Sequence, residues 1–183
     1  RFRSVLGQIN WLQSRTQFQA SYAFSRCASY AASPSIANCK ELNKLVRTTR
    51  AGYEGKNVVL KFWPLKGPHR LVGYPYASYQ NNKPDMSSQK GHMIFLAEQR
   101  RRETKSPKAS LLDFDSRKIR KEVQSTTVAK LYAVMKCYGT TQYLRGLWKD
   151  IAGETCPIHM RTDANNLVTT AATTHLPEQR ETI

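Results

Sequence analysis

The sequence predicts an α/β protein: a mixed sheet whose elements follow the order β-β-β-α-β-α, preceded by a helical segment. Three observations predict this class. Apolar residues recur at helical spacing up to about residue 55, short apolar and aromatic runs separated by turn residues follow, and a long amphipathic pattern comes next. We therefore divide the chain into a helical segment, residues 1–55, and a mixed-sheet domain, residues 56–183.

Three candidate helices make up the helical segment. The first carries apolar residues at helical spacing, namely Val5, Leu6, Ile9 and Leu12. The second covers roughly Phe18–Ala32. The third follows Pro34, and Gly52 and Gly55 indicate where it ends.

Four runs are candidate strands: Leu71–Tyr79, His92–Ala97, Ala109–Phe114 and Pro157–Thr162. Val58–Trp63 is a further short apolar run of the same kind. Pro75 indicates a sheet edge or a bulge, because proline cannot donate to a strand ladder. The polar stretch Glu98–Lys108 joins the second and third of the four strands, and we expect it to form a basic hairpin loop.

The strongest helical pattern lies between the third and fourth of these strands. Its apolar residues recur on one face, which we expect to belong to the core: Val128, Leu131, Tyr132, Met135 and Tyr138. The pattern continues after Gly139 as far as Ile151, so it predicts one long helix or two helices that meet near Gly139. Gly153 is a candidate C-terminal cap, and Asn165–Ala172 is a short helix after the last strand.

The charge balance narrows the class of partner. The chain has 29 Lys and Arg against 13 Asp and Glu, a formal net charge of +16. This balance argues against a small-molecule substrate and predicts a polyanionic partner, nucleic acid and RNA in particular, or the protein chains of a ribonucleoprotein. No apolar run approaches the roughly 18 residues of a membrane span, so we expect no membrane partner, and residues 1–13 are too polar for a signal peptide.

Thiols and imidazoles show no metal-binding pattern. The cysteines at positions 27, 39, 137 and 156 form no CxxC pair, and the four histidines lack zinc-ligand spacing. We therefore expect free thiols in an intracellular, reducing compartment, with no metal site and no cofactor.

Positive charge gathers in two places, which together form the expected nucleic-acid interface. The predicted hairpin loop contains Arg100, Arg101, Arg102, Lys105 and Lys108. The approach to the central helix contains Arg117, Lys118, Arg120 and Lys121. Tyr74, Tyr76 and Tyr79 in the first strand either stack on bases or pack at the sheet edge.

A series of short motifs carries a family resemblance. In chain order they are Arg3–Leu12, Ser25–Ser29, Leu42–Arg47, Leu71–Tyr79, Ser88–Leu96, Ser125–Ala129, Tyr143–Leu147 and Thr162–Leu167. The series resembles the end of the reverse transcriptase and the following RNase H domain of copia-type retrotransposon polyproteins. The resemblance implies an RNase H-like domain that is truncated at its C-terminus. It also implies phosphodiester hydrolysis with two Mg²⁺ ions held by clustered carboxylates.

The positions of those carboxylates depart from the family pattern. Tyr76 stands where the first strand of the family carries Asp, Lys130 stands where its central helix carries Glu, and Asp163 is the remaining acid. A phenol and an ammonium group cannot hold Mg²⁺, so we expect a catalytically inactive module. We also expect Asp163 to be a buried carboxylate with Lys130 beside it as its counter-charge.

Two alternatives stay open. One is a metal-dependent ribonuclease H with Mg²⁺ as cofactor, whose acidic site is rebuilt from Asp85, Asp113, Asp115 and Glu122. The other is a decayed retroelement fragment with no present role.

Overall fold

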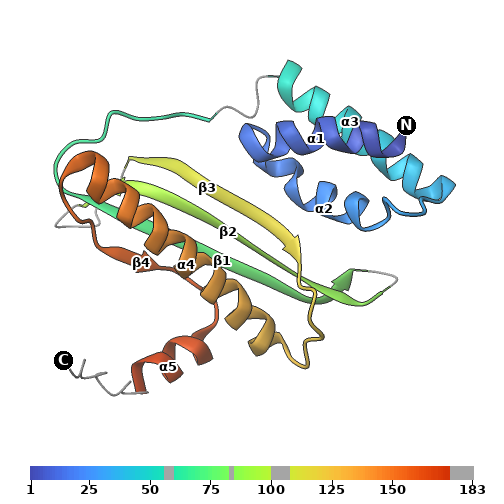
Figure 1. Cartoon of the computed structure of the whole chain (residues 1–183). Helices are drawn as coiled ribbons and strands as arrows, with labels where there is room; N and C mark the ends of the chain where they lie inside the picture. Colours follow the sequence, from blue (N-terminus) through green and yellow to red (C-terminus); the bar gives the residue numbers. More distant parts are fainter. Residues whose placement is uncertain (56–59, 83–84, 100–107, 174–183) are drawn as a thin grey trace.

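A computed structural model describes residues 1–55, 60–82, 85–99 and 108–173 of the 183-residue chain (Figure 1). Its elements are α1 (Phe2–Arg15), the 3₁₀ turn η1 (Phe18–Ala20), α2 (Ser21–Ser29), α3 (Ile36–Glu54), β1 (His69–Asn82), β2 (Ser87–Glu98), β3 (Ala109–Lys118), α4 (Thr126–Ala152), β4 (Ile158–Met160) and α5 (Asn165–Thr173). The four strands form one mixed sheet, so the predicted mixed α/β class is confirmed.

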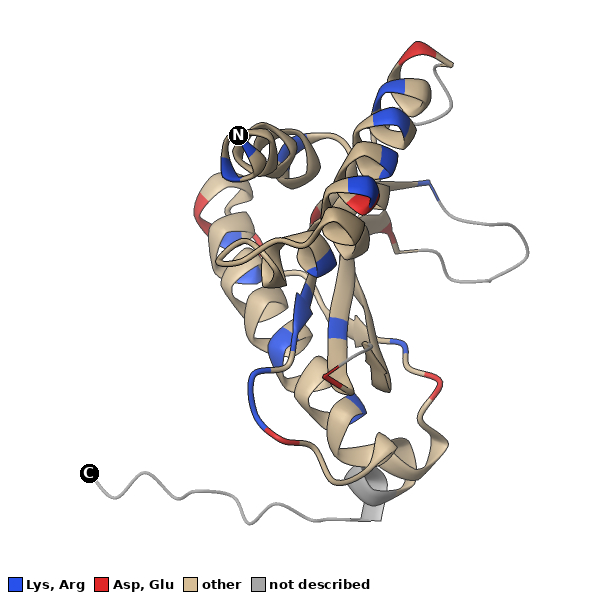
Figure 2. Ribbon diagram, turned by 90° about the vertical axis from the view of Figure 1, so that its right-hand side faces the viewer, with Lys and Arg blue, Asp and Glu red and all other residues tan. Residues whose placement is uncertain are grey.

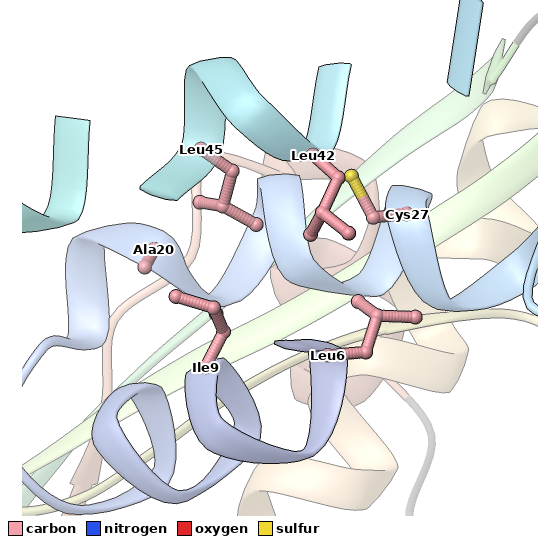
Figure 3. Close-up of a cluster of buried hydrophobic side chains, with 6 residues drawn as sticks. All are labelled: Leu6, Ile9, Ala20, Cys27, Leu42 and Leu45. Carbon is pink, nitrogen blue, oxygen red and sulfur yellow. The ribbon is translucent and has the colours of Figure 1, made fainter. Parts of the chain in front are cut away.

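The three N-terminal helices share a small apolar core. Six buried side chains converge from α1, η1, α2 and α3 (Figure 3): Leu6, Ile9, Ala20, Cys27, Leu42 and Leu45. Each helix is apolar along one stripe, and the stripes can leave water only by packing on one another. The helical segment therefore has a core separate from the core of the sheet.

Local hydrogen bonds set the limits of these helices. The Ser35 hydroxyl accepts a hydrogen bond from the backbone N–H of Asn38 at 3.2 Å, and the Asn38 side-chain oxygen accepts one from the Ser35 N–H at 2.9 Å. This reciprocal pair satisfies two amides at the start of α3. The second predicted helix is shorter than Phe18–Ala32, because η1 and α2 divide the range and α2 ends at Ser29.

The sheet has the strand order β3-β2-β1-β4, with β1 antiparallel to β2 and parallel to β4. Pro75 lies in this central strand. The amide of Leu71 donates to the carbonyl of Pro157 at 2.9 Å, and the carbonyl of Gly73 accepts from the amide of Arg161 at 2.8 Å. The backbone of these odd-numbered residues thus points toward β4, whose pairing ends opposite Gly73. Pro75 follows that point, so its missing N–H removes no bond from the ladder.

Strand limits differ from the expected ones. β1, β2 and β3 extend beyond their apolar runs, because main-chain pairing continues through polar residues. β4 has only three residues. Residues 60–63 of the apolar run Val58–Trp63 are not a strand, and residues 56–59 lie outside the described parts. The amide of Trp63 donates instead to the hydroxyl of Ser110 at 3.0 Å.

The helix α4 crosses one face of the sheet (Figure 1). It is a single helix without a break at Gly139, and Gly153 ends it with φ of 71° as predicted. Its buried seam consists of small residues four apart: Ala129, Ala133, Cys137 and Thr141. Beneath it, a Cβ atom on Gly73 would lie 2.9 Å from the Cys137 sulfur, so Gly73 permits the close approach of helix and sheet.

The prediction that Met135 and Tyr138 belong to the core is wrong. Met135 is 62% exposed, and Tyr138, Leu131 and Val128 are exposed beside it on the outer face of α4. Of the expected apolar face, Tyr132 is half-buried and packs against the cluster that contains Ala129 and Ala133. The helix carries apolar side chains on two faces, and the face with the smaller side chains packs against the sheet.

Charged residues are spread over the helical segment and the sheet domain. Figure 2 shows Lys and Arg on the helical segment, on the sheet and on the connections, with fewer Asp and Glu among them. This distribution is in line with the net charge of +16.

Within the described ranges, no helix combines the length and the apolar character that a bilayer span requires.

Gly73→Val tests the close approach of α4. We expect this variant to lower the free energy of unfolding by about 1–3 kcal/mol, because the new methyl groups have no room beside Cys137 and Met160. Urea unfolding measures it. Gly139→Ala is the matched control: apart from its own helical turn, nothing lies within 4 Å of the added Cβ, and removing a glycine from a helix interior raises stability by up to about 1 kcal/mol. Equal stability of the two variants would contradict the close approach.

Candidate nucleic-acid interface

Lys130 and Asp163 lie together, as expected. The Lys130 Nζ atom on the first turns of α4 is 3.1 Å from Oδ2 of Asp163, which follows β4. The parallel pairing of β1 with β4 and the packing of α4 on the sheet bring the two elements to this point. The expectation of a buried carboxylate is wrong, since the Asp163 side chain is 59% exposed. The pair is therefore a surface ion pair, which stabilises by roughly 0–1 kcal/mol.

Tyr76 lies on the other face of the sheet. Its neighbour Ala77 is buried against Ala129 and Ala133 of α4, and successive side chains of a strand alternate between faces. Tyr76 instead lines a hollow that faces α2. The structure thus brings Lys130 and Asp163 together and places Tyr76 away from them.

These residues do not fit a pair of Mg²⁺ ions. One exposed carboxylate, already bound to an ammonium group, is a poor donor set for a divalent cation. Three of the four acids of the rebuilt site are held by other partners: Asp113 lies 2.7 Å from His92, Asp115 bonds Arg117, and Asp85 bonds Lys118. The fourth, Glu122, is exposed in the connection before α4. Among the described residues, no three His, Cys, Asp or Glu side chains form a metal-binding cluster.

Three of the four cations before α4 line a hollow between the helical segment and the end of β3, whereas Lys121 is exposed and is not part of that lining. Arg117 and Lys118 end β3 rather than flanking the helix, and Arg120 follows in the connection. We call this cavity of about 480 Å³ the basic hollow. It is lined by Asn10, Gln13, Phe24, Ser25, Ala28, Ser29, Asp115, Ser116, Arg117, Lys118 and Arg120. Two helices of the helical segment thus form one wall, and the end of β3 forms the other.

Two carboxylates orient two of the three cations of the basic hollow. The Arg117 Nε atom is 2.7 Å from Oδ1 of Asp115, and the Lys118 ammonium bonds Asp85. The hydrogen bond from Lys118 holds the pKa of Asp85 below its ordinary value, so Asp85 stays ionised at neutral pH. Arginine has five N–H donors and lysine three, so each cation keeps donors for a phosphate.

A second cavity adjoins the first. It has a volume of about 330 Å³, and we call it the aromatic hollow; its lining comprises Phe18, Gln19, Ser21, Tyr22, Tyr74, Tyr76, Gly91, His92, Met93, Phe114, Asp115 and Ser116. Asp115 and Ser116 line both hollows. The two cavities are therefore neighbours along β3, and α2 contributes to both.

A chain of side-chain hydrogen bonds ties α2 to the sheet next to these hollows. The Tyr22 hydroxyl donates to Oδ1 of Asn82 at 3.4 Å, Nδ2 of Asn82 donates to Oε1 of Gln89 at 3.3 Å, and Nε2 of Gln89 donates to the Ser116 hydroxyl at 3.0 Å. Asn82 and Gln89 are buried, so these bonds satisfy polar groups that cannot reach water. Phe18 and Phe114 add an edge-to-face contact at 5.9 Å.

The remaining predicted cations lie elsewhere. Arg100, Arg101, Arg102 and Lys105 are outside the described residues. Lys108 precedes β3 and stacks over Trp63 with its Nζ atom 5.7 Å from the ring centroid. It is ten residues from Lys118, so an extended strand separates them by about 30 Å. The expected interface therefore consists of separate surfaces, of which the basic hollow is the one that the structure describes.

The contribution of the helical segment had no signal in the sequence. Phe24, Ser25, Ala28 and Ser29 of α2 are uncharged and carry no motif for phosphate binding. Their position follows from the docking of α2 on β3, a contact between segments about 90 residues apart in sequence. The contact of Phe18 with Phe114 likewise had no signal in the sequence beyond the apolar character of the two residues.

Comparison with known proteins adds no assignment. No protein-family model, no curated protein and no solved structure matches the chain.

The four cysteines are free and differ in exposure. Cys39 is exposed, whereas Cys27, Cys137 and Cys156 are buried. Burial raises the pKa of Cys27 and of Cys156, and it raises the pKa of Cys137 to about 11. The buried thiols are therefore protonated and unreactive at neutral pH.

Alkylation separates these thiols. At about pH 8 we expect iodoacetamide to modify Cys39 first, because the thiolate is the nucleophile and the raised pKa values keep the buried thiols neutral. Mass spectrometry of tryptic peptides over time measures the four rates. In urea the four rates should converge. Modification of Cys137 in the folded protein as fast as that of Cys39 would contradict the packing of α4.

Proposed function

We propose that the chain is a non-hydrolytic nucleic-acid-binding module, with RNA as the expected partner, acting alone or as a structural subunit of a ribonucleoprotein. The observation that carries the proposal is the basic hollow, where Arg117, Lys118 and Arg120 line one cavity. Phosphate oxygens are the ligands that such a group of cations binds. The net charge of +16 supports a polyanion over a small acidic ligand.

An RNase H-like fold and a retroelement origin are part of this proposal. The order β3-β2-β1-β4, with β1 and β4 parallel and α4 across one face, supports such a fold. The ordered series of copia-like motifs supports the origin. The Lys130–Asp163 ion pair supports loss of hydrolysis, because the ammonium takes up the charge of the carboxylate that a metal ion would need.

Charge removal at the basic hollow tests nucleic-acid binding. We expect the triple variant Arg117→Gln, Lys118→Gln, Arg120→Gln to weaken binding of a single-stranded RNA by about 10- to 100-fold. The slope of log K against log salt should fall in magnitude by about two, because fewer counterions are released. Fluorescence anisotropy with unrelated RNA sequences measures both, and the loss should be similar for each sequence.

A variant with the same charge change on α4 is the control. This triple variant removes three exposed cations of α4, on the opposite side of the sheet: Lys136→Gln, Arg145→Gln and Lys149→Gln. Equal losses in the two triple variants would mean that net charge alone attracts RNA and would reject the basic hollow as the interface. The expectation that Arg100, Arg101 and Arg102 also contact phosphates stays a prediction.

A hydrolysis assay tests the inactive site. We expect no cleavage of an RNA–DNA hybrid with Mg²⁺ or Mn²⁺, since Lys130 repels cations beside the one remaining acid. Gel analysis of an end-labelled hybrid measures this. Metal-dependent cleavage that Asp163→Asn abolishes would reject the proposal in favour of a ribonuclease H. Cleavage that persists in Asp163→Asn would indicate a contaminating nuclease.

A further inference from the structure

Tyr76 is an exposed aromatic residue on a sheet face that is partly covered. Its side chain is on the α2 face of β1, where it lines the aromatic hollow, and the residue is 63% exposed. Tyr74, two residues earlier on the same face, is 41% exposed. Side chains this exposed add little to the core, so packing does not explain why two tyrosines stand at the mouth of a cavity.

The aromatic hollow is preorganised for a flat ligand. The ring of Tyr74 meets Phe95 edge to face at 5.8 Å, which fixes one wall. Residues two apart on a strand are about 7 Å apart, a spacing that allows one planar ring to contact each tyrosine. The cavity of about 330 Å³ has room for a nucleobase.

The hollow also offers a polar group for the edge of such a ring. The Ser116 hydroxyl accepts a hydrogen bond from Gln89 at 3.0 Å, which leaves the hydroxyl proton to donate to an acceptor. Ser116 lines the aromatic hollow and the basic hollow alike. A ligand that spans both hollows therefore passes over this residue.

We infer that the site takes a single-stranded nucleic acid, with a base in the aromatic hollow against Tyr76 and the adjacent phosphates on Arg117, Lys118 and Arg120. This inference rests on the proposed function and names its substrate class. In a duplex the bases are stacked on one another and paired, so their faces cannot reach a tyrosine at the mouth of a cavity. In a single strand every base has a free face, and stacking on an aromatic ring is independent of sequence.

Tyr76→Leu tests the inference. We expect it to weaken binding of a single-stranded RNA by about 5- to 150-fold, because a stacking contact is lost. The slope of log K against log salt should not change, because no ion pair with a phosphate is lost. Tyr76→Phe should keep wild-type affinity, since it retains the ring. Binding of a duplex of the same sequence, and of a strand whose bases are replaced by abasic sites, should not change in either variant. Fluorescence anisotropy measures each affinity, with a DNA strand of the same sequence in parallel.

Tyr143→Leu is the matched control. Tyr143 is 66% exposed and lies on α4, across the sheet from the hollows, so its loss should leave binding unchanged. Urea unfolding should show that Tyr76→Leu is as stable as the wild type. Unchanged single-strand affinity in Tyr76→Leu, or equal loss in Tyr143→Leu, would overturn the inference. If neither single strands nor duplexes bind at low salt, the proposed function itself fails.

Discussion

The close contact between α4 and the sheet is the constraint on which the sheet domain depends. The helix packs on β1 through Ala129, Ala133, Cys137 and Thr141, and Gly73 of the strand lies beneath Cys137. Small residues on both sides let the backbones approach, and a side chain at Gly73 would meet sulfur atoms at under 3 Å. With this seam fixed, the outer face of α4 is fixed too, so Val128, Leu131, Met135 and Tyr138 are exposed to solvent. Tyr132, Leu144 and Trp148 pack against the buried clusters instead. The same seam sets the start of α4 beside the end of β4.

The sheet divides the two features that the family resemblance placed together. Lys130 and Asp163 lie where α4 and β4 meet, whereas Tyr76 faces α2. The two departures from the family pattern therefore have separate physical consequences. On one face, an ammonium group neutralises an exposed carboxylate. On the other face, the phenol ring of Tyr76 adds aromatic surface to the aromatic hollow, which adjoins the basic hollow.

The sequence predicted what depends on local pattern. The β-β-β-α-β-α order and the cap at Gly153 are both present. The proximity of Lys130 to Asp163 was expected from the family resemblance and not from a local pattern. The face that α4 buries could not be predicted, because larger side chains such as Met135 formed a stronger pattern than the Ala, Cys and Thr seam. Burial was decided by how closely the backbones could approach, which depends on Gly73 in another element. The two hollows depend on the docking of α2 against β3, and no spacing within either segment encodes that contact.

The carboxylates that bond the cations of the basic hollow strengthen the case for phosphate binding. Asp115 engages the Nε atom of Arg117, and this leaves the terminal guanidinium nitrogens for another ligand. Asp85 holds Lys118 in the same way through one of its three protons. Both side chains are thus ordered before a ligand arrives, which lowers the entropy that binding must overcome. The local charge is small, because two carboxylates offset two of three cations. Long-range attraction of a polyanion then comes from the whole chain, with its net charge of +16, while the hollow contributes the orientation of the phosphates.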